Sequence, residues 1–541
     1  MLSLGGNIWQ ISEIDDNLGK RMAEVCNLSL PVAEILCAHG IDVDEAQDFI
    51  NPKIQKLMPD PYVLKDMQKA AERIAQAIEN GEKIGIIGDY DVDGATSTAE
   101  LVKFIHNFNL EAAVHIPSRE EGYGPSDLAF AEFAEQNIKL VITIDCGTTA
   151  FEVLNRVGKT FDVIIIDHHE AEAKLPDVYA VVNPKRLDED YQAKYLKYMA
   201  AVGVGFMTLV AVNRVLREHN FYVNRPAPDL MKFLDLVALG TVCDVVPLRG
   251  LNRAYVKQGL KIMAGQSNVG LKNLMSVLEL KEAPSAYHLG FVLGPRINAC
   301  GRVGDATLGS KLLCSENDFE ARILAEKFNQ FNIERKEIEN YVLLQAIEQV
   351  ESQVAEFPMV FAYGDNWHQG VIGIVAGKLK ERYNIPAFVM SIESDEVKGS
   401  ARSVDGIDLG ALIISAKEKG LITGGGGHIM AAGFSLTKDK LAEFKKFVGE
   451  YIAERLGDEK VEPVLNIDCV VHLTGINEKF ADELSVLEPY GTDNREPLVL
   501  LKDVRIIKPQ IIGNGHVRCF LTTDMGGNLP AIAFRCTDNQ I

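Results

Sequence analysis

Three short apolar runs in the first half of the chain each end abruptly in an acidic residue. The runs are residues 83–88, 139–144 and 163–166. Asp89, Asp145 and Asp167 follow them in that order. Runs of this length that are rich in β-branched residues are typical of strands buried on both faces, as in parallel sheets. We therefore predict a parallel sheet whose strands end in carboxylates.

Helical spacing of apolar residues is found on both sides of these runs. Residues 1–80 are expected to form a mainly helical lead-in that packs on the predicted catalytic domain. A long, highly charged stretch without proline, residues 319–350, favours a largely solvated linker helix between two lobes. Shorter helices are expected over residues 95–108, 199–215 and 233–240, and one more strand over residues 112–116.

The pattern changes after Phe357-Pro358 and again near residues 458–463. Strands are expected over residues 359–363 and 387–391 with a helix over 370–382, which predicts a second, smaller α/β domain. Beyond residue 463, short β-like runs alternate with glycine-containing turns, which favours a small all-β barrel of the OB type.

The fold class is therefore α/β. The predicted parts are a lead-in (1–80), a catalytic parallel-sheet domain (81–310), a linker helix (311–355), a substrate-binding α/β domain (356–457) and an OB-like barrel (464–541).

The composition of the chain limits its expected binding partners and its cellular location. The 541 residues carry a net charge of −21, which argues against a polyanion binder held by global charge but not against a local basic groove. Nine cysteines without CxxC spacing favour a reducing, cytoplasmic location. The N-terminus lacks the features of a signal peptide, and the longest apolar run, residues 199–212, is too short to span a bilayer.

The acidic strand ends suggest a metal site. Asp91 and Asp93 follow Asp89 at alternate positions, and His168 and His169 follow Asp167. The carboxyl ends of parallel strands share one edge, where this much unneutralised charge would be strongly repulsive. Divalent cations would neutralise it, so we predict a di-metal site. A surface turn in which Asp167 caps a helix is the plainer alternative.

A further carboxylate, Asp244, lies between apolar residues, where burial is costly without a partner. A metal would be such a partner, and a helix-terminal cap is the alternative.

Two glycine-rich stretches are candidates for phosphate contacts. Residues 294–304 are expected to form a loop with two arginines, Arg296 and Arg302. Residues 424–427 are four glycines before His428, and a loop of this kind leaves N–H groups free to cradle an anion. The Ser400-Ala-Arg402 stretch supports this interpretation, although a flexible turn would also fit. Arg119, in another loop, is either a phosphate contact or part of a solvated turn.

Two divalent ions bridged by carboxylates can activate a water molecule and neutralise a phosphoryl oxygen. Ligands that are mostly oxygen, with one or two imidazoles, favour Mn²⁺ or Mg²⁺ over a structural zinc. The residues alone therefore indicate a metal-dependent phosphoesterase.

The motifs also resemble a known family. Residues 88–94, 145–147, 167–169 and Asp244 are similar to the four ordered motifs of the DHH phosphoesterases. Residues 294–302, 400–402, 426–433 and 487–491 resemble further motifs of the bacterial single-strand-specific exonucleases in that family. The resemblance covers almost the whole chain. It departs at residues 492–497, which affects contacts of the barrel rather than the chemistry.

The resemblance implies 5′→3′ degradation of single-stranded DNA to mononucleotides, in recombination and mismatch repair. It implies two divalent ions, Mn²⁺ or Mg²⁺, and a single-stranded-DNA-binding protein and a helicase as protein partners. The implied metal ligands are Asp89, Asp91, Asp93, Asp145, His168 and Asp244. The catalytic residues would be Asp91, Asp93, Asp145, His168 and His169. The substrate contacts would be His169, Arg296, Asn298, Arg302, Ser400, Arg402, Gly426, Gly427 and His428.

Two alternatives stay open. One is another enzyme of the same superfamily, such as an oligoribonuclease, a cyclic-dinucleotide phosphodiesterase or a pyrophosphatase, although these are typically shorter or carry membrane or sensory segments. The other is a non-catalytic DNA-binding scaffold, which the intact acidic set argues against because an inactive relative gains nothing from that repulsion.

Overall fold

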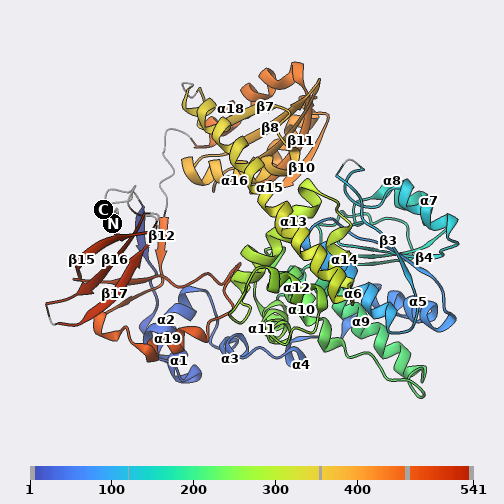
Figure 1. The fold of residues 1–541 in the computed structure, drawn as a ribbon, viewed down its shortest axis with the longest axis horizontal. Helices are drawn as coiled ribbons and strands as arrows, with labels where there is room; N and C mark the ends of the chain where they lie inside the picture. The colour runs from blue at the N-terminus through green and yellow to red at the C-terminus, as the bar shows by residue number, and fades with distance from the viewer. Residues whose placement is uncertain are drawn as a thin grey trace. The chain divides into compact units, whose positions relative to one another are not determined.

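The structure is a computed structural model that describes residues 7–119, 121–352, 356–456, 464–513, 515–524, 526–534 and 536. The chain forms two compact units (Figure 1). One comprises residues 11–329 and 466–539, and the other comprises residues 330–465 with the N-terminal residues up to Gln10. The domain boundary predicted at residues 458–463 lies outside the described residues.

The first unit contains the predicted parallel sheet. Its strands lie in the order β3 (Ala112–His115), β2 (Ile84–Ile87), β4 (Leu140–Ile144), β5 (Asp162–Ile166) and β6 (Ala180–Val182), all parallel. The three strands that precede the acidic residues, β2, β4 and β5, are neighbours at its centre. The predicted α/β class is confirmed.

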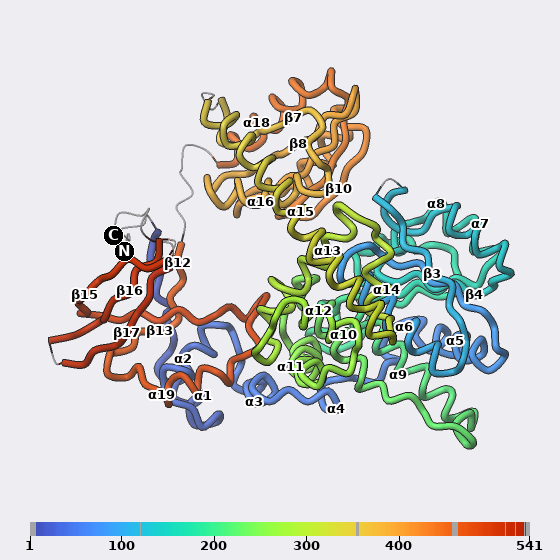
Figure 2. Tube along the Cα trace, in the orientation of Figure 1, coloured from blue at the N-terminus to red at the C-terminus, as the bar shows by residue number. Residues whose placement is uncertain are grey.

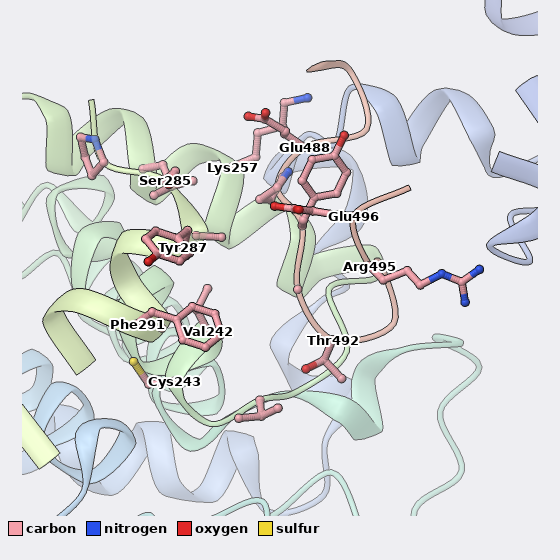
Figure 3. Close-up of a pocket in the computed structure, with 18 of the residues that line it drawn as sticks. Val242, Cys243, Lys257, Ser285, Tyr287, Phe291, Glu488, Thr492, Arg495 and Glu496 are labelled. Atoms are coloured by element: carbon pink, nitrogen blue, oxygen red, sulfur yellow. The ribbon is translucent and has the colours of Figure 1, made fainter. Parts of the chain in front are cut away.

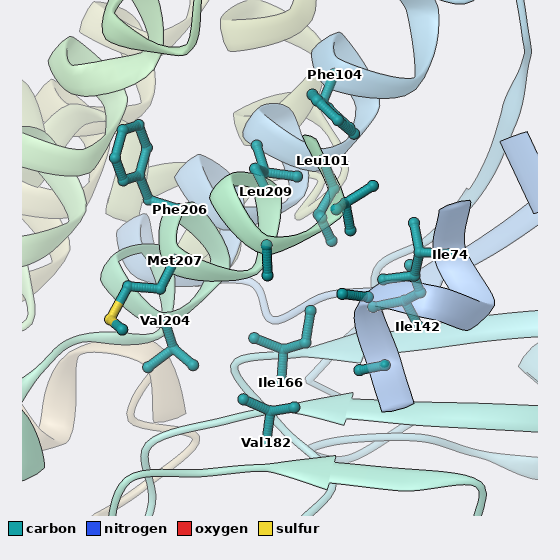
Figure 4. Close-up of a cluster of buried hydrophobic side chains, with 14 of the residues drawn as sticks. Ile74, Leu101, Phe104, Ile142, Ile166, Val182, Val204, Phe206, Met207 and Leu209 are labelled. Atoms are coloured by element: carbon teal, nitrogen blue, oxygen red, sulfur yellow. The ribbon is translucent and has the colours of Figure 1, made fainter. Parts of the chain in front are cut away.

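Helices cover both faces of this sheet, which explains why its central strands are continuously apolar. On one face lie α5 (Met67–Asn80), α6 (Val92–His106) and α9 (Ala201–Glu218). On the other lie α7 (Asp127–Glu135) and α8 (Phe151–Val157). Figure 4 shows Ile142 and Ile166 of the sheet facing Leu101 of α6 and Leu209 of α9. This packing fixes the strand ends, and therefore the acidic residues, in place.

The remaining helices of the catalytic region follow in sequence. They are α10 (Leu234–Cys243), α11 (Gly250–Ala264), α12 (Val269–Val277), the π-helix η4 (His288–Leu293), α13 (Gly294–Val303) and α14 (Leu308–Cys314). The prediction of a loop at residues 294–304 is wrong, because this stretch is α13. Its glycines permit close packing: a Cβ on Gly294 would lie 2.5 Å from Cys243 Sγ, and one on Gly301 would lie 2.7 Å from the Tyr90 carbonyl oxygen.

The long charged helix is confirmed as α15 (Asp318–Glu351), a continuous element of 34 residues. Its start differs from the predicted linker boundary at residue 311, which lies inside α14. Neither half is wholly solvated: Ala325 and Phe328 are buried in the first half, and Val342 and Ala346 are buried in the core of the second unit.

The second unit is built on a mixed sheet. Its strands lie in the order β10 (Gly424–His428), β11 (Ala431–Thr437), β9 (Glu396–Arg402), β8 (Ala387–Glu393) and β7 (Val360–Asp365). Only β7 and β8 are parallel. Helix α16 (Gln369–Tyr383) packs on one face, and α17 (Leu409–Glu418) and α18 (Leu441–Leu456) pack on the other. The glycine run predicted as a loop is the edge strand β10.

The lead-in divides between two cores, and its first part also contacts the catalytic domain, where Arg253 donates to the Phe49 carbonyl oxygen at 2.6 Å. Helices α4 (Ile54–Leu57) and α5 contact the catalytic core. Helices α1 (Asp16–Cys26), α2 (Leu30–Ala38) and α3 (Ala46–Ile50) share a core with β13 (Cys469–Val471), β14 (Val499–Leu501) and α19 (Glu478–Ser485). Figure 2 shows these N-terminal helices, in blue, beside the red C-terminal segments.

The C-terminal region is not all-β, because it includes α19. Strands β13 and β14 form a small parallel pair, and β15 (Arg505–Ile512), β16 (His516–Thr522) and β17 (Asn528–Ala533) form an antiparallel sheet. Strand β1 (Ile8–Ile11) pairs with β12 (Val464–Ile467). Within the described residues, no helix is long and apolar enough to cross a bilayer.

Candidate metal centre

The acidic residues that follow the central strands converge at one edge of the parallel sheet. Three overlapping groups each place one potential ligand atom per residue within 4.8 Å of the others. The groups are Asp89, Asp91 and Asp145; Asp93, His168 and Asp244; and Asp145, His168 and His169. Six residues predicted as metal ligands are therefore brought together, with His169 beside them.

His168 stands at the middle of the cluster. Its Nε2 lies 3.3 Å from Asp145 Oδ1 and 3.8 Å from Asp93 Oδ2, and its Nδ1 lies 3.5 Å from Asp244 Oδ2. Burial lowers the pKa of His168 to about 3, so the ring is neutral at physiological pH. A neutral imidazole offers a lone pair, which is what a metal ligand requires.

The carboxylates around it are buried or half-buried, and several of their oxygens are not used as hydrogen-bond acceptors. Among the described residues, Asp89 Oδ1, Asp145 Oδ1 and Asp244 Oδ2 are buried without a hydrogen-bond donor. Burial, with repulsion from Asp91, raises the pKa of Asp89 and of Asp93 to about 7. Burial, with repulsion from Asp93 and then Asp91, raises the pKa of Asp145 and Asp244 well above the usual range. These acids ionise together only if cations join them.

Two of the carboxylates are also fixed by helix N-termini. Asp93 accepts hydrogen bonds from the backbone N–H groups of Ala201 (2.6 Å) and Val202 (3.0 Å) at the start of α9. Asp91 accepts one from Gly94 at the start of α6, at 3.0 Å. Helix N-termini stabilise negative charge, so these contacts orient the two carboxylates without neutralising the cluster.

Asp167 behaves differently, although its motif belongs to the same acidic set. Its Oδ1 accepts from His168 N and from His169 Nδ1, both at 2.8 Å, and its Oδ2 accepts from Thr148 N at 3.0 Å. These bonds and the neighbouring histidine charge hold the pKa of Asp167 well below its usual value despite burial. Its lone pairs are occupied, so it positions His169 rather than contributing to the ligand groups.

His169 lies at the rim of the cluster with its side chain 40% exposed. Asp167 raises the pKa of His169 against the opposing effect of burial. Tyr123 Oη lies 3.2 Å from His169 Nδ1 and donates to the Asp145 carbonyl oxygen at 2.8 Å. Sequence reasoning missed Tyr123, because it follows a strand with no acidic motif, in an otherwise polar loop.

The predicted arginines differ in their surroundings. Arg119 stacks 4.4 Å above the ring of Tyr90 and donates to the Gly301 carbonyl oxygen at 2.6 Å. Its charge partly opposes the rise that burial causes in the pKa of Asp89. Burial raises the pKa of Tyr90, and the charge of Arg302 partly opposes that rise. Arg296 instead donates to Val292 O (2.7 Å) and Asn329 Oδ1 (3.3 Å), which is a structural role. Asn298 lies between them on α13, half-buried.

In the second unit, strand pairing places most of the predicted substrate contacts on one sheet face. Ser400 pairs with Gly433, which pairs with Gly426. In the next row, Arg402 and His428 both pair with Ala431. Because alternate residues of a strand share a face, these positions form one surface.

The glycines of β10 differ according to their face. A Cβ on Gly426 would meet no atom within 4 Å, whereas one on Gly427 would lie 2.5 Å from the Ala431 carbonyl oxygen. Gly427 therefore faces the opposite, packed side. Strand N–H groups alternate in direction, so the predicted cradle of converging N–H groups is wrong. What Gly426 provides is a flat, open backbone on the sheet face that also carries Arg402, which donates to Ser400 Oγ at 3.1 Å.

Comparison with known proteins bears on this arrangement. Residues 83–241 match the DHH family, N-terminal domain; residues 356–454 match the DHHA1 domain; and residues 467–541 match the RecJ OB domain. The single-stranded-DNA-specific exonuclease RecJ of Escherichia coli (strain K12) is 34% identical over 486 residues, which cover 87% of this chain and 84% of that protein. The chain belongs to the RecJ family.

Further RecJ proteins are similar to this chain in sequence and in structure. That of Bacillus subtilis (strain 168) is 36% identical over 513 residues, which cover 92% of this chain and 62% of the relative's length. A solved structure of RecJ from Thermus thermophilus in complex with Mn²⁺ has a TM-score of 0.81 and 28% identity, covering 97% of this chain and 74% of that one. The fold and order of domains are therefore those of the RecJ family.

Proposed function

We propose that this protein is a divalent-metal-dependent exonuclease that degrades single-stranded DNA 5′→3′ and releases mononucleotides. The observation that carries the proposal is the cluster of buried carboxylate oxygens without donors around the neutral His168. The names of its RecJ relatives support the substrate, and the 5′→3′ direction rests on the family resemblance.

Two ions fit the donor set. Asp89, Asp91 and Asp145 would hold one ion, and Asp93, His168 and Asp244 would hold the other. Asp145 is the candidate bridge, because it belongs to two of the ligand groups and follows the central motif strand. Mn²⁺ or Mg²⁺ suits these mainly oxygen donors, and both occur in solved structures of Thermus RecJ. When bound, such a pair activates a water molecule and neutralises phosphoryl charge.

The chain's own residues would then orient the scissile phosphate. Asp167 holds the His169 ring through Nδ1, so the opposite nitrogen can donate to a phosphate oxygen. The raised pKa of His169 keeps that ring a donor near neutral pH. Tyr123 connects His169 to the Asp145 backbone, so that the ring and the proposed bridging ligand are fixed relative to each other.

Substrate contacts away from the metals would come from Arg302, Arg119 and the open face of the second sheet. On that face, Arg402 and His428 are the cationic and donor groups, and Ser400 fixes the Arg402 guanidinium. The open backbone at Gly426 leaves room for close approach by a phosphate or sugar.

The cellular setting follows from the same proposal. A single-strand-specific exonuclease would act in recombination and repair, with a single-stranded-DNA-binding protein and a helicase as partners. All nine cysteines are free, which supports a reducing compartment and hence the cytoplasm.

The test is digestion of single-stranded DNA labelled at its 5′ end or at its 3′ end, with Mn²⁺ or with EDTA. We expect Mn²⁺-dependent release of the 5′ label as a mononucleotide at once, while the 3′ label shortens progressively. Preference for short RNA oligomers would favour another enzyme of the superfamily. Binding without digestion would favour the scaffold.

A further inference from the structure

A cavity of about 850 Å³ lies beside the metal centre and is not used by the proposed chemistry. One wall comes from the end of α10 and from η4, and the other from residues 485–496 (Figure 3). Cys243 and Val245, the neighbours of Asp244 on both sides in sequence, line it. The residues on both sides of the proposed metal ligand Asp244 therefore form part of the cavity wall.

Two aromatic rings stand exposed on the first wall. Tyr287 and Phe291 are 62% and 72% exposed, and their rings are stacked with centroids 5.3 Å apart and planes at 28°. Phe291 belongs to the π-helix η4, an element that occurs often at functional sites. Val245, 67% exposed, has a φ of +59°, which is rare for a β-branched residue. Exposed apolar groups that line one cavity together, as these three do, mark a site of interaction.

The opposite wall is fixed to the catalytic region by several contacts. Arg253, fully buried, donates to the carbonyl oxygens of Leu487 (2.8 Å), Glu488 (2.8 Å) and Pro489 (3.0 Å). The Leu248 N–H donates to the Thr492 carbonyl oxygen at 2.9 Å. The cavity is thus a preformed space within one compact unit.

Its charges indicate what kind of group it accepts. Lys257 is already bound to the Ile50 carbonyl oxygen at 2.7 Å, and Arg495 is paired with Asp468. Figure 3 shows Arg495 pointing away from the two rings. Glu488 and Glu496 also line the cavity. With the cations engaged and two carboxylates present, a phosphate or an acidic peptide is disfavoured, whereas a neutral ring with N–H donors is favoured.

We propose that Tyr287 and Phe291 form a stacking platform for an unpaired nucleobase of the substrate, one or more nucleotides from the scissile bond. The proposal rests on the proposed function, since it assumes a single-stranded nucleic acid at the metal centre. Aromatic faces accept any base, so the platform gives affinity for unpaired strands without sequence preference. Glu488 and Glu496 provide acceptors for exocyclic amines.

The first arm of the test needs no variant. A 3′-labelled 12-mer binds the wild-type protein in EDTA, and its affinity is compared with that of 12-mers carrying one abasic site moved stepwise from the 5′ end. We expect the loss of a base to weaken binding about 5- to 150-fold at one or two adjacent positions and little elsewhere. A flat profile, or no binding at all, overturns the proposal.

The second arm identifies the platform. Phe291→Ala and Tyr287→Ala are expected to weaken binding of the intact 12-mer about 5- to 150-fold and to abolish the penalty of the abasic site. Phe291→Trp should restore both. The matched control is Phe319→Ala, a phenylalanine 74% exposed outside the cavity, which should bind as wild type does.

If Phe291→Ala binds DNA as well as Phe319→Ala does, the platform serves something else and the proposal is overturned. Digestion of the intact strand by the wild-type protein with Mn²⁺ is measured in parallel. Failure of that digestion would overturn the proposed function, while the two binding arms would still decide whether the platform holds a base.

Discussion

The edge of the catalytic sheet and the open face of the second sheet differ in burial and in charge. At the catalytic edge, Asp93 and Asp145 are 1% and 2% exposed, and ligand oxygens lack donors. On the second sheet, Gly426 and His428 are exposed, and nothing demands neutralisation. Buried carboxylates are held in fixed orientations, but their charge must be balanced by a cation. An exposed strand of glycines needs no such balance, and by itself it gives a substrate few contacts. We therefore expect chemistry to depend on the first region and affinity on the second.

The catalytic edge also contains an internal comparison. Asp145 and Asp167 are both buried, yet the pKa of Asp145 is raised and that of Asp167 is lowered. The difference is the number of donors: Asp167 accepts from two histidine groups and Thr148, while Asp145 Oδ1 accepts none. Asp167 therefore has a structural role, whereas Asp145 has an oxygen available to bind a cation.

The largest effect should come from Asp145→Asn. This change removes the proposed bridging charge, so the rate on single-stranded DNA with Mn²⁺ should fall by several orders of magnitude. The matched control is Asp162→Asn at the opposite end of the next strand, which should keep the wild-type rate. Retention of more than about a tenth of the rate by Asp145→Asn would contradict the assignment.

Next in size is the contrast in stability between Asp167→Asn and Asp145→Asn without metal. Asp167→Asn loses charge-assisted hydrogen bonds and should lower the free energy of unfolding by about 2–4 kcal/mol. Asp145→Asn should raise it, because it removes an unpaired buried charge. Denaturant melts in EDTA check both signs, and a shift of the two variants in the same direction would erase the distinction between them.

The pH dependence of the Asp145→Asn effect has a defined sign. A carboxyl whose pKa is raised in the folded state costs nothing below its ordinary pKa and costs progressively more as pH rises. The stabilisation by Asp145→Asn in EDTA should therefore grow from pH 5 to pH 8, and saturating Mn²⁺ should reverse it.

His428→Ala should have a smaller effect on the rate. Loss of one hydrogen bond to a charged group is worth about 1.5–3 kcal/mol, which corresponds to about one to two orders of magnitude in activity. Mn²⁺ affinity should be unchanged, because the ligand groups lie in the other unit. Weaker Mn²⁺ binding by His428→Ala would contradict the claim that metal binding depends only on the catalytic region.

The smallest effects should separate two neighbouring glycines. Gly426→Ala places a methyl group in open space, so it should melt as wild type does but bind single strands less tightly. Gly427→Ala places one 2.5 Å from a carbonyl oxygen and should lower stability by about 1–3 kcal/mol. Thermal melts and DNA-binding curves of the two variants distinguish them. Equal melting temperatures would contradict the assignment of Gly426 to the open face and Gly427 to the packed face.

The sequence could predict the parallel sheet and its acidic edge because both are local signals. A buried strand that ends in carboxylates is visible in a few residues, and the parallel-sheet rule then brings distant strand ends together. For the same reason the α15 helix and the strands β7 and β8 were predictable from periodicity alone.

The failures involve contacts between distant segments. Both glycine-rich stretches were predicted as loops, yet Gly301 is small because Tyr90 packs against it, and Gly427 because Ala431 does. Glycine content indicates flexibility only when no neighbour requires the space. The shared core of α2 and β13 could not be predicted either, since the two segments are separated by most of the chain. Deleting residues 464–541 would therefore remove part of that core as well as the barrel.

The most direct test of the metal centre is calorimetric titration of the metal-free protein with Mn²⁺ near pH 7.5. We predict two Mn²⁺ ions per chain and a release of protons on binding, because the pKa values of Asp89 and Asp93 are raised to about 7 without metal. Asp145→Asn should lose at least one ion, while His428→Ala should bind both. The absence of Mn²⁺ binding by the wild-type protein, or unchanged binding in Asp145→Asn, would contradict the claim that this carboxylate cluster is a metal centre.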